Sequence, residues 1–184
     1  MTWRVGVGDE AARVVAARAA EWLARENGTG ILEQVMQLGF KHAEELREVR
    51  EEIGRGDLEA AARECADLVI TARTSQCGLL GRRHAGRPVP VAAATTQDNI
   101  ELQEWELTNA VLDIGKIGVA WRAQNPRKRA RGEHLCTEDV VDHLDEVVLQ
   151  ACRLIHALGC DIYEVLLAGA NKVHARLDEM GVPR

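Results

Sequence analysis

One short stretch of the chain holds five glutamates whose spacing concentrates negative charge on a helix. They are Glu44, Glu45, Glu48, Glu51 and Glu52. Residues three and four apart are neighbours on a helix surface, so every such neighbour of Glu48 is another acid. Like charges at this spacing destabilise an isolated helix by roughly a few tenths of a kcal/mol each, and no Lys or Arg follows Glu48 by four residues. A bound cation is the simplest source of the missing positive charge.

A second pair of acids, Glu64 and Asp67, lies on one face of the next expected helix. Apolar residues follow Asp67 directly, and a carboxylate near a dry region needs a charge partner or a metal because its desolvation is costly. Only residues 54–57 join the two helices, which must therefore fold back as an antiparallel hairpin. That geometry can bring both of these acids close to Glu45 and Glu48.

Four carboxylates in one site would favour hard divalent cations. Their charge would be neutralised by two such ions, and oxygen ligands select Mg²⁺ or Mn²⁺ over zinc. These ions commonly serve phosphate chemistry, because they bridge phosphoryl oxygens and activate a water. The alternative interpretation is an ordinary solvated helix face, on which the acids hold no metal.

The elements that would position these acids are all expected to be helices. Leu and Ala recur at spacings of three and four, and the pairs Asp98 with Glu101 and Asp161 with Glu164 are typical of capping boxes. Residues 68–71 could pass for a strand, but the sequence around them has helical periodicity. The expected helices, caps included, cover residues 10–26, 31–53, 57–80, 98–121, 137–158 and 161–180. We therefore expect an all-α, antiparallel helical bundle.

The composition of the 184 residues excludes several classes of protein. With 46% hydrophobic and 28% charged residues, the chain is too apolar and too mixed in sign to be disordered. No apolar run reaches the ~20 residues that cross a bilayer, and the first residues do not fit a signal peptide. The 23 Lys and Arg against 29 Asp and Glu give a net charge of −6, which argues against stable nucleic-acid binding. The five cysteines lack zinc-ligand spacing and indicate a reduced, cytoplasmic protein.

The acidic motifs resemble those of the MazG-like, all-α nucleotide pyrophosphohydrolases. The matching residues are 41–48 (KHAEELRE), Gly56-Asp57 and 64–68 (ECADL), which together give an EExxE helix followed by ExxD. The resemblance covers residues 31–80 well and residues 100–178 loosely.

This resemblance implies a reaction and a set of site residues. The reaction is Mg²⁺-dependent cleavage of a nucleoside triphosphate between its α and β phosphates, which gives a monophosphate and pyrophosphate. A carboxylate-held or metal-bound water would attack the phosphorus in line. Glu44 would be an auxiliary acid and Lys41 a phosphate contact. The catalytic metal ligands would be Glu45, Glu48, Glu64 and Asp67.

The second half of the chain resembles the same family more weakly. Residues 124–128 (QNPRK) and the acidic segments that follow, 138–140 and 146–148, are similar to MazG-like sequences with a QNPRK loop between two acidic helices. In this register the residues that correspond to Glu44, Glu45, Glu48, Glu64 and Asp67 are Asn109, Ala110, Asp113, His143 and Glu146.

Such a register implies an internal duplication whose second copy has lost part of its acidic set. Ala110 offers no ligand atom, and His143 is a poor ligand for Mg²⁺. We expect the copies to pack as a pseudo-dimer, with an intact half at residues 1–86, a linker at 87–97 and a degenerate half at 98–184.

Some further residues have two interpretations. The basic run from Arg127 to Arg131, with Arg127 and Lys128 as candidate substrate contacts, could grip a triphosphate or form a solvated loop. Trp22 and Trp105 are expected in the core or at an interface, although a tryptophan can also stack on a base.

We therefore expect a cytoplasmic nucleoside triphosphate pyrophosphohydrolase that uses Mg²⁺, or Mn²⁺, and whose partner is its nucleotide substrate rather than a membrane. One alternative is a catalytically silent helical scaffold or regulator with the same fold. Another is a pyrophosphohydrolase that acts on a phosphoribosyl nucleotide. A homodimer is compatible with this scheme but not required, because two tandem copies could already complete a site.

Overall fold

The structure is a computed structural model that describes residues 2–27, 31–80, 87–89, 99–122 and 137–183. Within these ranges all regular structure is helical, which confirms the expected all-α bundle and places residues 68–71 inside a helix. No helix of the described residues has the length and apolarity needed to cross a membrane. The helices are α1 (Thr2–Asn27), α2 (Ile31–Arg55), α3 (Leu58–Leu80), α5 (Ile100–Arg122), α7 (Thr137–Ala157) and α8 (Ile162–Glu179).

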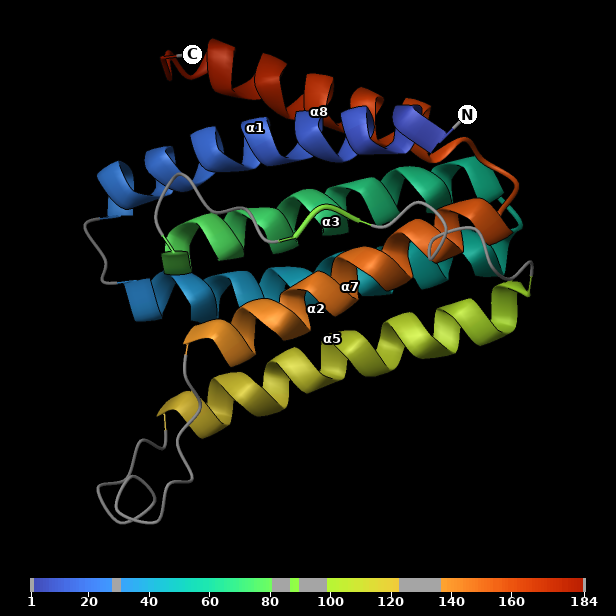
Figure 1. Cartoon of the computed structure of the whole chain (residues 1–184), viewed down its shortest axis with the longest axis horizontal. Coiled ribbons are helices and arrows are strands. Elements are labelled where there is room, and N and C mark those ends of the chain that lie inside the picture. The colour runs from blue at the N-terminus through green and yellow to red at the C-terminus, as the bar shows by residue number, and fades with distance from the viewer. Residues whose placement is uncertain (1, 28–30, 81–86, 90–98, 123–136, 184) are drawn as a thin grey trace.

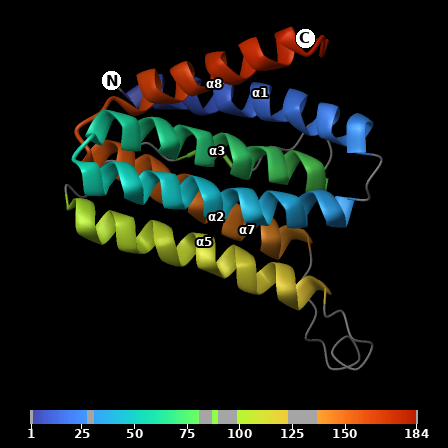
Figure 2. The same cartoon turned by 180° about the vertical axis from the view of Figure 1, so that it is seen from behind.

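The bundle is organised around α3, which packs against α1, α2, α7 and α8. Helix α2 also contacts α5, and α5 in turn contacts α7 (Figure 1). The first and last helices, α1 and α8, pack together on one side of the bundle, and α5 lies on the opposite side (Figure 2). The chain therefore brings its two terminal helices side by side above the acidic hairpin of α2 and α3.

One cluster of buried apolar side chains draws on all six helices, so the two expected halves share a core. Their origin by duplication remains a prediction. Cys65 and Cys152 belong to this cluster and are fully buried. Burial raises the pKa of the Cys152 thiol to about 12, and it raises the pKa of Cys65 as well, so both behave as small apolar residues.

The turn between α2 and α3 is fixed by local backbone chemistry. Gly56 has φ +78°, and its N–H donates to the carbonyl of Ile53 at 3.0 Å. The N–H of Asp57 donates to the main-chain carbonyl of Glu52 at 3.0 Å. This is a Schellman motif, which requires the left-handed conformation that glycine adopts without strain. The Asp57 carboxylate then accepts the N–H of Ala60 at 2.9 Å and caps α3. The hairpin that the sequence predicted is thus closed within a few residues.

Two expected helix starts were wrong. The cap of α5 is Asn99, whose side chain accepts the N–H of Leu102 at 3.0 Å, while Asp98 lies outside the described residues. Helix α1 begins at Thr2 rather than near Glu10. Gly8 lies inside this helix, where it allows close packing against α8. A Cβ at this position would lie 3.0 Å from the Cα of Tyr163 on α8.

This close approach of α1 and α8 predicts that Gly8→Ala lowers stability by about 1–2 kcal/mol. The added methyl meets backbone that cannot give way, and overpacking of this kind outweighs the higher helix propensity of alanine. Gly115→Ala in α5 is the matched control, since no described atom lies within 4 Å of its added Cβ. We expect that control to gain up to about 1 kcal/mol in urea unfolding. Equal gains for both variants would show that Gly8 has no packing role.

A buried ionic network crosses the core at Arg73, whose side chain is fully buried. Its guanidinium donates to the Asp9 carboxylate at 2.8 and 3.1 Å, to Asp145 at 2.8 Å and to the side-chain oxygen of Gln76 at 2.9 Å. It also donates to the carbonyl of Arg87 at 2.8 Å, and the Arg87 N–H donates back to Asp145 at 3.1 Å. The network therefore ties α1, α3 and α7 to the segment 87–89.

Candidate metal and phosphate site

The α2–α3 hairpin and helices α1 and α8 enclose a pocket of about 450 Å³, called the acidic pocket below. Its lining includes all four predicted ligands, Glu45 and Glu48 from α2 and Glu64 and Asp67 from α3. One carboxylate oxygen from each of Glu45, Glu48 and Glu64 lies within 4.8 Å of the other two. Two helices from a single hairpin thus present three ligand atoms to one point.

Two of these carboxyl groups hold their protons more tightly than an ordinary glutamate. Burial raises the pKa of Glu45, and the nearby charges of Asp67 and Glu48 raise it further, against the opposing effect of Lys41. Burial likewise raises the pKa of Glu64, helped by the charge of Asp67. Both ionised groups are therefore destabilised by their surroundings, and a bound cation would relieve that cost.

Asp67 stands next to this cluster and is partly satisfied by α8. The Lys172 ammonium donates to its Oδ2. Its Oδ1 is buried and has no hydrogen-bond partner among the described residues. A buried acceptor left open beside three converging carboxylates is a position that a cation or a donor group would fill.

A second lysine neutralises part of the cluster from within α2. Lys41 lies 2.7 Å from Glu45 Oε1 and 3.1 Å from Glu44 Oε2. Burial opposes its charge, but the hydrogen bonds to these two carboxylates raise the pKa of Lys41. Of the four pocket carboxylates, one therefore faces Lys41 and another faces Lys172. Among the described residues, the two pocket carboxylates that have no lysine partner are Glu48 and Glu64.

The charges of the two glutamates near the end of α2 are neutralised by arginines on the same helix. Glu51 pairs with Arg47, and Glu52 pairs with Arg55. Arg47 also lies 3.4 Å from Glu48, so the repulsion expected around Glu48 is smaller than the sequence suggested. Glu51 and Glu52 do not line the acidic pocket, and neither does Glu44, which is half-exposed.

The pocket also contains residues that the sequence reasoning missed. Lys172 and Arg176 of α8 line it, with Lys172 in contact with Asp67, and Ala19 and Leu23 of α1 form part of an apolar wall. The two cationic residues are four apart on one helix face, which was visible in the sequence. Nothing in the sequence indicated that α8 would pack beside the α2–α3 hairpin.

The second half assembles no comparable cluster. Among the described residues the only group of three or more candidate metal ligands is that of the acidic pocket. Glu146 is exposed and accepts a hydrogen bond from Gln150 at 2.6 Å. The candidate substrate contacts Arg127 and Lys128 lie outside the described residues.

The two tryptophans differ in environment. Trp22 of α1 is half-buried and packs against the core. Trp105 of α5 is 60% exposed, so of the two expected places, core or interface, its side chain does not occupy the core. Neither tryptophan is among the residues that line the acidic pocket.

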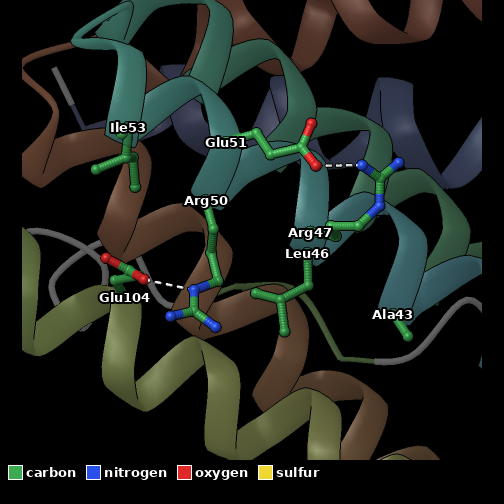
Figure 3. A pocket seen from close by; sticks show the side chains of 8 residues that line it. Ala43, Leu46, Arg47, Arg50, Glu51, Ile53 and Glu104 are labelled. Atoms are coloured by element: carbon green, nitrogen blue, oxygen red, sulfur yellow. Dashed lines mark hydrogen bonds and ion pairs between the residues drawn. The ribbon is translucent and has the colours of Figure 1, made fainter.

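A larger pocket of about 530 Å³ lies between α2 and α5, but its charged groups are already paired (Figure 3). Arg50 donates to Glu104 at 2.7 Å, and Arg47 donates to Glu51. The figure shows both ion pairs over a wall that includes Leu46 and Ile53. This pocket presents no converging ligands and is the groove between two packed helices.

Comparison with protein-family models, with curated proteins and with solved structures finds no match to this chain. What can be inferred about its chemistry therefore depends on the geometry of the acidic pocket. That geometry combines carboxylates at metal-binding spacing with three cationic side chains, in a space large enough for a small molecule.

Proposed function

We propose that the protein is a cytoplasmic, Mg²⁺-dependent nucleoside triphosphate pyrophosphohydrolase that acts in the acidic pocket. The observation that carries this proposal is the meeting of opposite charges there. Glu45, Glu48 and Glu64 converge within 4.8 Å, and Lys172 and Arg176 line the same space. A polyphosphate bound with a divalent cation presents the complementary pattern of charge. The MazG-like motifs on α2 and α3 support the same reaction.

The residues of the pocket fit a hard divalent cation. The donor set is entirely carboxylate oxygen, which suits Mg²⁺ or Mn²⁺. The pKa values of Glu45 and Glu64 are raised, and Asp67 Oδ1 has no partner among the described residues. A bound cation would stabilise the two ionised glutamates and coordinate the open oxygen of Asp67. When bound, Mg²⁺ would polarise phosphoryl oxygens and make a water more acidic.

The other residues of the pocket have separate tasks in this proposal. Lys172 and Arg176 bind the phosphates of the leaving pyrophosphate, and Lys41 orients Glu45 through their 2.7 Å contact. Ala19 and Leu23 would form an apolar part of the pocket wall that limits the access of water. No aromatic ring lines the described pocket, so base recognition would rest on shape and hydrogen bonding rather than on stacking.

The proposal extends to the architecture of the chain. We infer that α2–α3 and α5–α7 descend from one duplicated hairpin, since α2 packs against α5 and α3 against α7. Only the first hairpin keeps its acids together, and α8 from the second half supplies cations to it. The active site would thus be shared between the halves, which is how a tandem protein can work without a second chain.

The proposed function is tested by two measurements on the same protein. Calorimetry should detect about one Mg²⁺ per chain, because the lysines leave the charge of one divalent ion to be neutralised. A panel of ribo-, deoxyribo- and phosphoribosyl nucleotides should include at least one that releases pyrophosphate. Metal binding without turnover of any nucleotide would favour the silent scaffold instead.

A Lys172→Ala variant should separate phosphate binding from metal binding. We expect KM for the nucleotide to rise about 10–100-fold, because a hydrogen bond to a charged group is worth about 1.5–3 kcal/mol. Mg²⁺ affinity should be equal or higher, since loss of the ammonium frees the Oδ2 of Asp67. Arg55→Ala, on α2 outside the pocket, is the control and should change neither value. Loss of metal binding in Lys172→Ala would contradict this division of roles.

A further inference from the structure

The side chain of Arg18 on α1 is buried and binds only the C-terminal part of the chain among the contacts described for it. Its Nε donates to the carbonyl of Pro183 at 2.9 Å. Its Nη1 contacts the carbonyl of His174 at 3.3 Å and the ring Nδ1 of the same residue at 3.2 Å. Its Nη2 donates to Asp178 Oδ1 at 2.6 Å and to the carbonyl of Val182. All three nitrogens of the guanidinium therefore donate to α8 or to the tail that follows it.

The tail reaches Arg18 because α8 ends in a Schellman motif. Gly181 has φ +71°, and its N–H donates to the main-chain carbonyl of Asp178 at 3.0 Å. The N–H of Val182 donates to the carbonyl of Leu177 at 2.9 Å. This turn reverses the chain, so that the carbonyls of Val182 and Pro183 lie beside Arg18 rather than continuing away from the bundle. Arg18 and residues 181–183 together are called the C-terminal clamp below.

The clamp lies where α1 and α8 border the acidic pocket. Ala19, which follows Arg18, lines that pocket from α1. On α8, His174 is held by Arg18 and lies between Lys172 and Arg176, both of which line the pocket. At its opposite end α8 approaches α1 at Gly8, where the added Cβ would meet Tyr163. The position of α8 along α1 is therefore fixed at both ends.

We propose that Arg18 is a positioning residue, which sets the register of α8 so that Lys172 and Arg176 line the acidic pocket beside the acids. This inference rests on the proposed function of the pocket. A planar guanidinium with five donors can hold several carbonyls at fixed angles, whereas a lysine ammonium offers three donors from a flexible stem. The acids belong to α2 and α3, and none of the hydrogen bonds described for Arg18 reaches those helices. The clamp therefore acts mainly on the phosphate contacts, and it reaches the metal ligands only through the contact of Lys172 with Asp67.

The test compares Arg18→Lys, Arg18→Ala and a chain without residues 181–184 with the unaltered protein. In each we expect KM for the nucleotide to rise on the order of 10- to 100-fold, because misplacement of a binding group by about 1 Å has effects of this size. We expect kcat and calorimetric Mg²⁺ affinity to stay within about threefold. Arg25→Ala is the control on the same helix, since Arg25 pairs only within α1 among the contacts described, and it should leave KM unchanged.

The possible outcomes separate this inference from the function on which it rests. If Lys172→Ala raises KM but the tail deletion and both Arg18 variants do not, the clamp is only structural and the inference is overturned. If KM rises and Mg²⁺ affinity falls together in the variants, Arg18 supports the whole fold rather than α8, and the inference is again overturned. Should Arg18→Ala fail to fold, the tail deletion decides the question. If the unaltered protein turns over no nucleotide, the proposed function is wrong, and so is this inference, which rests on it.

Discussion

A Glu64→Gln variant is expected to lose nucleotide turnover by at least about 100-fold while its fold is kept. Glu64 offers one of the three ligand atoms that converge in the acidic pocket. Removal of groups that only support a metal ligand costs about 10–100-fold, so loss of a ligand itself should cost more. The measurement is pyrophosphate release at saturating Mg²⁺, with circular dichroism as the check on folding.

The same substitution should make the protein more stable when metal is removed. Burial and the charge of Asp67 raise the pKa of Glu64, so its ionised form destabilises the folded state. That destabilisation is complete above the raised pKa, shrinks as the pH falls through it, and is gone below the ordinary value of 4.5. In EDTA at neutral pH the variant should therefore unfold at a higher temperature than the unaltered protein, and the difference should vanish near pH 4.

Added Mg²⁺ should reverse that order, because a ligand that binds only the folded state stabilises it. The unaltered protein should gain thermal stability with Mg²⁺, and Glu64→Gln should gain much less. Glu59→Gln is the matched control, since Glu59 lies on the same helix, is exposed and pairs loosely with Arg63 at 4.0 Å. It should keep full activity and the normal response to Mg²⁺. If the Glu64→Gln variant stays active, Glu64 is not a metal ligand of the active site.

An Arg73→Met variant is expected to lose about 3–5 kcal/mol of unfolding free energy. The substitution leaves the buried carboxylate of Asp9 and the mostly buried carboxylate of Asp145 without their shared cation. Breaking a buried ion pair on one side costs this much because the remaining charge is uncompensated. The segment 87–89 should loosen as well, since it is held by the same groups. Urea unfolding and hydrogen exchange would measure both effects.

Two further variants show whether the charge network itself is responsible. Arg63→Met, on the same helix but exposed, should change stability by no more than about 0.5 kcal/mol. Adding Asp9→Asn to Arg73→Met should recover part of the loss, because one of the two uncompensated charges is removed. A loss below about 1 kcal/mol in Arg73→Met, or no recovery in the double variant, would show that the network contributes little.

Local sequence signals predicted most of the helices well. Helix α3 has the expected bounds, because Asp57 is a strong cap and Gly56 fixes the preceding turn. The N-terminus of α1 was misplaced near Glu10, because nothing in the sequence indicates that Gly8 lies within a helix and allows α8 to approach. A glycine in a helix has the same appearance in a sequence whether it breaks the helix or packs against another.

The candidate site could be predicted only as far as its residues are local. Glu45 and Glu64 meet because they lie on two helices of one tight hairpin, and a hairpin can be derived from its turn. Lys172 reaches the same pocket from α8, which is distant in sequence, and its pairing with Asp67 depends on how the helices pack. Arg73 was missed for a similar reason, since Asp9 and Asp145 lie on two other helices. Packing between distant helices sets these contacts, and periodicity does not reveal it.

The most direct test of the proposed function is to identify the products formed from a nucleoside triphosphate with Mg²⁺, by phosphorus NMR. The proposal predicts nucleoside monophosphate and pyrophosphate in equal amounts, with no reaction in EDTA or with Glu64→Gln. Release of orthophosphate as the first product would contradict cleavage between the α and β phosphates. Absence of turnover across the whole nucleotide panel, together with absence of Mg²⁺ binding by calorimetry, would contradict the assignment of the acidic pocket as a catalytic site.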